Sequence, residues 1–193
     1  MSSITWNETR QRIRADKQRL KTFYEQSPSG KPLWLLLNHS FLCVYLHRLS
    51  HFFFDRNNKV LARFFWHLNL LLTGADISPL SDIGGGLIVK YPLCVIIVGK
   101  LGENCTIEGH GGIGGGRDIK DIGAGPGLPV IGNDVYMAMG SFILGPIEIG
   151  DGAYIEPKCF VTRTVPAGAT VECPQPRQRV QKSAVKAEKV SAE

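Results

Sequence analysis

One histidine stands among the glycines of the second half of the chain. It is His110, in the stretch Thr106-Ile-Glu-Gly-His-Gly-Gly-Ile113. An imidazole accepts a proton near neutral pH, so His110 is the first candidate for a general base in this half. No metal site is indicated, because the cysteines form no CxxC pair and no other histidine accompanies His110 there. The alternative is a solvent-facing corner residue without a chemical role.

The elements that would position His110 follow from a six-residue repeat. Apolar residues recur at every sixth position in two series, Ile77, Ile83, Val89, Val95, Leu101, Ile107 and Ile113, then Ile131, Met137, Ile143, Ile149, Ile155 and Val161. A period of six predicts a parallel β-helix in which three short strands make one coil of about 18 residues. The apolar residues then point inward and stack between coils. In this register Tyr91 and Pro92 lie beside Gly109 and His110 on the next coil.

The segment between the two series, at about residues 114–129, interrupts the repeat. Its many glycines, with Pro126 and Pro129, suit a loop better than strands. We expect it to be extruded over the active site. Because Ile113 and Ile131 are 18 residues apart, an irregular coil in register is the alternative.

The first part of the chain has a different composition, rich in aromatic residues. Residues 6–26 predict a charged helix, and residues 33–55 and 58–73 predict two apolar helices. The expected organisation is a helical region at 1–75, a β-helix at 76–170 and a basic tail at 171–193. The apolar helices need a cover, for which the β-helix end, another subunit and a membrane surface are candidates.

Charge and targeting signals are weak. The net charge of +5 comes without a nucleic-acid-binding motif, so we expect no nucleic-acid partner. The polar N-terminus, the odd number of cysteines and the interrupted apolar runs favour a cytoplasmic location.

Several stretches resemble the bacterial serine acetyltransferases and their shorter relatives encoded with exopolysaccharide genes. They are Leu72-Thr-Gly-Ala-Asp-Ile77, Ile83-Gly-Gly-Gly86, Asn104-Cys-Thr-Ile107, Pro129-Val-Ile-Gly-Asn-Asp-Val135 and Leu144-Gly-Pro-Ile-Glu-Ile-Gly-Asp-Gly-Ala153. The resemblance covers roughly residues 35–177 and implies a mostly β fold, a left-handed hexapeptide-repeat β-helix preceded by helices. It also implies acetyl-CoA as donor, a hydroxyl as acceptor and a homotrimer, with hexamers through the N-terminal helices as an option.

In the family this chain resembles, a catalytic histidine is supported by an aspartate fifteen residues earlier. Asp76 matches that aspartate, but Tyr91 stands where the histidine would be. A phenol ordinarily has a pKa near 10 and is a poor base at neutral pH. Residues 127–129 match the family's Arg-His-Pro motif as Gly-Leu-Pro, so the arginine that recognises the amino-acid carboxylate is missing. We therefore expect His110 as the base, with Tyr91 or Asp76 orienting it or the acceptor.

The resemblance further implies that coenzyme A takes hydrogen bonds from backbone amides at the coil corners. The matching donors are Gly115, Met139 and Pro157, of which Pro157 has no N–H. The expected cofactor-binding residues are Gly115, Ala138, Met139, Gly140, Lys158 and Arg177.

The leading prediction is acetyl transfer from acetyl-CoA to a hydroxyl of a sugar or another small alcohol. Serine acetylation with substituted catalytic residues and a catalytically inactive β-helix scaffold are the alternatives. Six charged side chains near His110 are expected to be solvated, namely Lys90, Glu108, Arg117, Asp118, Lys120 and Asp121.

Overall fold

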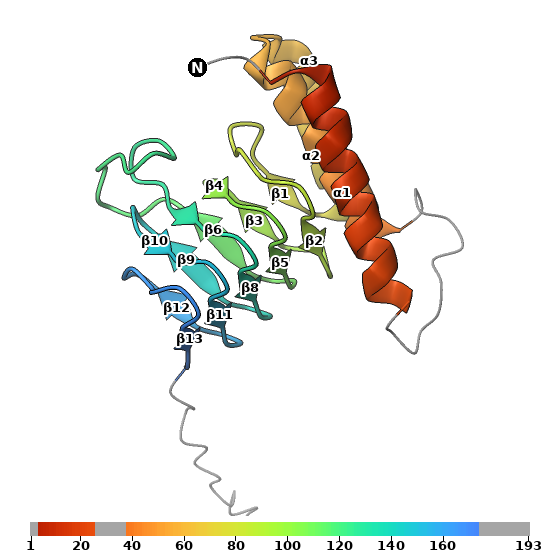
Figure 1. Ribbon diagram of the computed structural model, residues 1–193. Coiled ribbons are helices and arrows are strands. Elements are labelled where there is room, and N and C mark those ends of the chain that lie inside the picture. The colour runs from red at the N-terminus through yellow and green to blue at the C-terminus, as the bar shows by residue number, and fades with distance from the viewer. Residues whose placement is uncertain (1–3, 26–37, 174–193) are drawn as a thin grey trace, which may run out of the picture.

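In the computed structural model, residues 4–25 and 38–173 are described, and they form three helices followed by a stack of short strands (Figure 1). The helices are α1 (Trp6–Glu25), α2 (His39–Asp55) and α3 (Lys59–Thr73). The second predicted helix therefore begins at His39, and its expected residues 33–37 lie outside the described residues. Most of the expected basic tail, from residue 174 on and including Arg177, lies outside them as well.

The ends of α2 and α3 are set by local capping. The side chain of Asn38 accepts a hydrogen bond from the Phe41 N–H, and Asn58 does the same for Leu61 at the start of α3. These side chains satisfy backbone donors that have no partner within the helix. Gly74 ends α3 in the left-handed conformation (φ 73°), which glycine adopts without a steric penalty.

The strands form three parallel sheets, named here after their first strands. The β1 sheet contains β1 (Asp76–Ile77), β3 (Ile96–Ile97), β6 (Gly112–Gly114), β9 (Phe142–Leu144) and β12 (Phe160–Val161). The β2 sheet contains β2 (Ile88–Val89), β5 (Thr106–Ile107), β8 (Tyr136–Met137), β11 (Tyr154–Ile155) and β13 (Thr170–Val171). The β4 sheet contains β4 (Lys100–Leu101), β7 (Val130–Ile131) and β10 (Glu148–Ile149). Successive coils stack in Figure 1, so the predicted parallel β-helix is confirmed.

The inward positions form a continuous apolar core. Ile107, for example, is paired with Val89 on one coil and Met137 on the other, and all three are buried. Each coil buries its apolar edge only against its neighbours, so the core is a ladder of stacked aliphatic side chains.

One position of the predicted register is wrong. Ile97, not Val95, pairs with Ile77 and Ile113 in the β1 sheet. Val95 is also buried, but it precedes β3. The corner between β2 and β3 is therefore two residues longer than the corners below it, because Val89 and Ile97 are eight residues apart while Ile107 and Ile113 are six apart.

The segment between β6 and β7 leaves the coil. Ile131 pairs with Leu101 in the β4 sheet, whereas Ile113 belongs to the β1 sheet, so the two residues do not stack as an in-register coil requires. Within the segment, the Asp121 carboxylate accepts hydrogen bonds from the Gly123 and Gly125 N–H groups. These contacts hold the loop in a turn of its own.

A buried ion pair fastens the helices to the first coil. The Arg48 guanidinium on α2 donates to the Asp16 carboxylate on α1 at 2.9 and 3.0 Å. Arg48 also donates to the Ile83 and Gly84 carbonyls, and Asp16 accepts from the Leu87 N–H at 2.9 Å. Because both charges are buried and hydrogen-bonded, neither is left without a partner.

Candidate active site

A pocket of about 470 Å³ lies at the long corner between β2 and β3, where the helices meet the β-helix. We call it the corner pocket. Its described lining residues are Tyr24, Asn38, His39, Ser40, Thr73, Lys90, Tyr91, Pro92 and Leu93. They come from all three helices and the corner itself, so the two extra residues of the corner help to form the wall.

Hydrogen bonds hold the start of α2 against this corner. The Asn38 side-chain amide donates to the Tyr24 hydroxyl at 2.8 Å, and the Ser40 hydroxyl donates to the Lys90 carbonyl at 3.1 Å. The first turn of α2 is thereby fixed relative to α1 and to β2. This fixation places His39, the first residue of the helix, in the pocket wall.

Lys90, which lines the pocket, belongs to a charged network with two residues outside the pocket lining. Lys90 Nζ donates to Glu108 Oε1 at 2.9 Å and to the Tyr136 hydroxyl at 2.6 Å, and that hydroxyl donates to Glu108 Oε1 at 2.6 Å. Burial opposes the charge on Lys90, but the hydrogen bonds to Tyr136 and Glu108 outweigh it and raise the pKa of the amine. The pKa of Glu108 is lowered by the same two partners against the effect of burial. The expectation that Lys90 and Glu108 are solvated charges is therefore wrong.

Tyr91 lies where the register predicts it. The phenol is more than half exposed and lines the corner pocket, and its backbone lies against Gly109 on the next coil. A Cβ atom at Gly109 would fall 2.6 Å from the Tyr91 carbonyl oxygen, so only glycine fits there.

His110 is shifted by the longer corner. Its N–H donates to the Leu93 carbonyl at 3.3 Å, so it lies beside Leu93 rather than Pro92. It has φ 56° and occupies the same turn position as Gly140 and Lys158 on the following coils. The side chain is exposed and lies outside the described lining of the corner pocket.

Asp76 is separated from this group. Its carboxylate accepts a hydrogen bond from the Trp66 indole N–H at 2.7 Å, and its backbone pairs with Ile96 in the β1 sheet. Within residues 4–25 and 38–173, it makes no hydrogen bond with Tyr91 or His110. His39 lines the corner pocket but was not predicted as a site residue. No pattern in the sequence links the start of α2 to the corner of the β-helix.

The predicted coenzyme A donors differ in availability. The Met139 N–H donates to Glu108 Oε2 at 3.0 Å, and the Ala138 and Gly140 N–H groups donate to the Ile155 and Gly109 carbonyls. The Gly115 N–H has no partner among the described residues, and the Lys158 side chain is exposed. Of the predicted cofactor-binding residues that the structure describes, Gly115 and Lys158 therefore keep donors free of such contacts.

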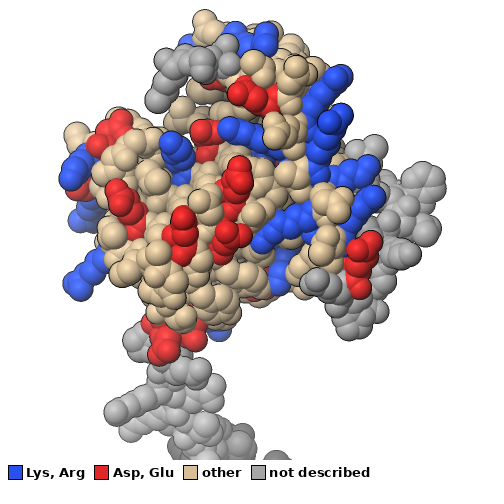
Figure 2. All heavy atoms as spheres, in the orientation of Figure 1, with Lys and Arg blue, Asp and Glu red and all other residues tan. Residues whose placement is uncertain are grey.

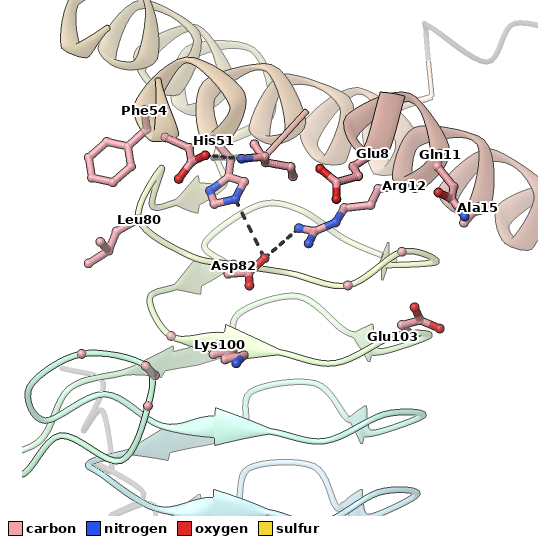
Figure 3. Close-up of a pocket in the computed structure, with 18 of the residues that line it drawn as sticks. Glu8, Gln11, Arg12, Ala15, His51, Phe54, Leu80, Asp82, Lys100 and Glu103 are labelled. Atoms are coloured by element: carbon pink, nitrogen blue, oxygen red, sulfur yellow. Dashed lines mark hydrogen bonds and ion pairs between the residues drawn. The ribbon is translucent and has the colours of Figure 1, made fainter. Parts of the chain in front are cut away.

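A second and larger pocket, of about 1090 Å³, lies on another side of the junction between helices and β-helix. We call it the junction pocket. Figure 3 shows Arg12 and His51 pointing from α1 and α2 toward Asp82. Arg12 donates to Asp82 at 2.7 Å, and His51 Nδ1 donates to the Pro79 carbonyl at 2.9 Å. Burial lowers the pKa of His51 below its ordinary value, which favours the neutral ring.

No family model matches the chain, but individual proteins do. The serine acetyltransferase of Bacillus pumilus is 30% identical over 159 residues, covering 80% of this chain and 71% of the relative. The serine acetyltransferase of Helicobacter pylori is 30% identical over 158 residues, which cover 78% of this chain and 88% of the relative.

Solved structures of serine acetyltransferases are also similar to this chain. The serine acetyltransferase of Neisseria gonorrhoeae in complex with serine is 27% identical, with a TM-score of 0.75, covering 88% of this chain and 68% of that chain. The soybean serine acetyltransferase apoenzyme is 26% identical, with a TM-score of 0.74, and the match covers 85% of this chain and 66% of that chain.

Fold and similarity together define a left-handed β-helix acyltransferase that uses acetyl-CoA to acetylate a hydroxyl group. The chain belongs to the serine acetyltransferase family. Enzymatic relatives of this kind do not support the inactive-scaffold alternative.

Proposed function

We propose that the protein transfers the acetyl group of acetyl-CoA to the hydroxyl of serine, with serine bound in the corner pocket. The relatives favour this alternative over the sugar acceptor that the missing family arginine had suggested. The observation that carries the proposal is the pocket itself, which surrounds Tyr91 at the position matching the family's base.

Lys90 supports serine as the acceptor. It is the one cationic side chain among the described residues that line the corner pocket. An ammonium has three N–H donors, of which Glu108 and Tyr136 occupy two. Lys90 Nζ also lies over the Phe23 and Tyr136 rings, 5.2 and 4.9 Å from their centroids. We propose that its third N–H binds the carboxylate of serine, so that Lys90 replaces the missing arginine as a point charge.

The reaction needs a base, because the serine hydroxyl must lose its proton when it attacks the thioester. One imidazole, that of His39, lines the corner pocket, and a second, that of His110, lies outside its lining. His110 remains the base proposed from the sequence, on the coil below Tyr91. His39 is the second candidate because it lines the pocket. Tyr91 is proposed to orient the acceptor, and Asp76, which accepts a hydrogen bond from the Trp66 indole N–H, is proposed to hold α3.

We further propose a homotrimer with acetyl-CoA in a groove between subunits. The outer face of the β1 sheet carries Ile96, Phe142 and Phe160, with the two phenylalanine rings stacked 4.9 Å apart. Phe160 is 68% exposed, so this face has apolar area to bury against another subunit. Light scattering on the purified chain measures the mass, and a monomer would contradict the trimer.

Release of the coenzyme A thiol from acetyl-CoA tests the acceptor. The panel is serine, serine methyl ester, which lacks the carboxylate charge, and a simple hexose. We expect the highest kcat/KM for serine and a loss of about 10- to 100-fold for the ester, because a hydrogen bond to a charged group contributes about 1.5–3 kcal/mol. Faster transfer to the hexose would overturn serine as the acceptor.

A further inference from the structure

The outer face of α3 is apolar where a surface helix is ordinarily polar. The residues that α3 buries are Ala62, Asn69 and Thr73. On the opposite side, Val60, Phe64 and Leu71 are 79%, 57% and 81% exposed. Their spacing of four and seven residues places them on one line along the helix. Leu61, Leu70 and Leu72 are also exposed and widen this line into a face, on which His67, between Phe64 and Leu71, is exposed and polar.

Positive charge accompanies this apolar face. Lys59 and Arg63 are exposed on α3, Arg56 lies in the turn before it, and the helix contains no Asp or Glu. Where α1 begins near the end of α2, the Trp6 ring packs on Phe52 at 5.0 Å, with Arg10 over Trp6 and Arg56 over Phe52. Of the nearby carboxylates, Asp55 accepts a hydrogen bond from the Ile4 N–H and Glu8 accepts from Thr5. Within the described residues, neither carboxylate forms an ion pair with Arg10, Arg56, Lys59 or Arg63.

A second basic feature lies on α1. Arg10, Arg14, Lys17 and Lys21 are exposed at intervals of four, three and four residues, which is one stripe of a helix. Figure 2 shows the blue side chains gathered along this helix. Such a stripe attracts anions over roughly a Debye length of about 8–10 Å. Because α1 and α3 both pack mainly on α2, the stripe is a basic feature separate from the α3 face.

The cover of the α3 face must match both its apolar and its cationic character. A second copy that packs α3 against α3 would supply apolar area. It would offer no carboxylate to Lys59 and Arg63, because α3 contains no Asp or Glu. An anionic bilayer supplies both, because exposed aliphatic and aromatic side chains enter the acyl boundary while Lys and Arg remain among the headgroups. None of the described helices is long and apolar enough to cross a bilayer. We propose that the α3 face docks this enzyme in the plane of an anionic lipid surface.

Sedimentation with lipid vesicles tests the docking on the full chain. Phosphatidylcholine vesicles are compared with and without phosphatidylglycerol, at low and high salt. We expect the wild type to bind the anionic vesicles and to lose binding as salt is raised. Replacement of the apolar line (V60S/F64S/L71S) is expected to lower the partition coefficient at least about tenfold. The matched control is L80S/I119S, which removes two exposed apolar side chains elsewhere and is expected to bind as the wild type does.

A second variant keeps the test independent of the apolar substitutions. K59E/R63E is expected to lower binding to anionic vesicles about fivefold for each cation removed, with little effect on neutral vesicles. Circular dichroism establishes that each variant folds. Wild-type protein that binds neither vesicle, or an apolar triple variant that binds as the wild type does, would overturn the docking. A triple variant whose mass falls in light scattering while its vesicle binding is unchanged would assign the face to a second copy instead.

Discussion

The two pockets at the junction between helices and β-helix differ in how their polar groups are used. In the junction pocket, Arg12 pairs with Asp82 and His51 donates to a backbone carbonyl. In the corner pocket, Tyr91 and His39 have no hydrogen-bond partner among the described side chains, and Lys90 donates to Glu108 and Tyr136. The corner pocket therefore offers an unpaired phenol and an unpaired imidazole to a ligand, whereas Arg12, His51 and Asp82 hold the helices in place at the junction pocket. Lys100 and Glu103 also line the junction pocket, and their side chains form no hydrogen bond within the described residues.

The largest effect on kcat/KM is expected when the imidazole that acts as the base, His39 or His110, is removed. Loss of a general base lowers kcat/KM by about 10²–10⁴-fold. His110→Ala and His39→Ala are compared by thiol release with serine as acceptor. We expect the variant that lacks the base to show this loss and the other variant to change kcat/KM by less than about fivefold. Full activity in both variants would show that no imidazole of the corner is the base.

The next largest effect concerns the ion pair that fastens the helices. Arg48→Met leaves the buried Asp16 carboxylate without its guanidinium partner, which typically costs about 3–5 kcal/mol of unfolding free energy. Urea denaturation measures it. Arg63→Met, on the exposed side of α3, is the matched control and should change the free energy by less than about 0.5 kcal/mol. Equal stabilities for the two variants would contradict the structural role of Arg48.

Acid should weaken the helical region through its buried histidines. Burial lowers the pKa of both His47 and His51, so below about pH 6.5 the unfolded chain binds more protons than the folded one. Stability is then full above that pH and falls as the pH drops, by up to about 1.4 kcal/mol per pH unit for each histidine.

His47→Leu isolates one of the two groups. Neither ring nitrogen of His47 has a hydrogen-bond partner among the described residues, and the ring stacks on His51 with the centroids 5.9 Å apart. Leucine should therefore remove the titration and replace this ring contact with aliphatic packing. Denaturation curves between pH 7 and pH 5 should show a shallower loss of stability than in the wild type. An unchanged slope would mean that His47 does not contribute to it.

The smallest effect is expected in the junction pocket. Asp82→Asn weakens the ion pair with Arg12, which is partly exposed and worth about 1 kcal/mol or less. The free energy of unfolding should fall by that amount, while kcat/KM for serine stays within about twofold. A large loss of activity at unchanged stability would move the active site to this pocket.

The fold followed from the sequence because the β-helix repeats one physical rule. Inward aliphatics six residues apart predicted most of the stacked pairs, but both Val95 and Ile97 are apolar and buried, so the pattern alone could not find the longer corner. The Lys90 and Glu108 contact was within reach, since opposite charges one 18-residue coil apart face each other on neighbouring strands. The place of His39 in the pocket could not be predicted from the sequence, because it depends on how α2 packs on the β-helix.

Lys90 tests the central claim, that serine binds in the corner pocket, most directly. The experiment compares the KM for serine in the wild type, in Lys90→Met and in Lys100→Met, which removes an exposed cation from the β4 sheet. We predict a rise of about 10- to 100-fold in the KM of Lys90→Met, an unchanged KM for acetyl-CoA and wild-type values for Lys100→Met. An unchanged KM for serine in a folded Lys90→Met protein would contradict the claim.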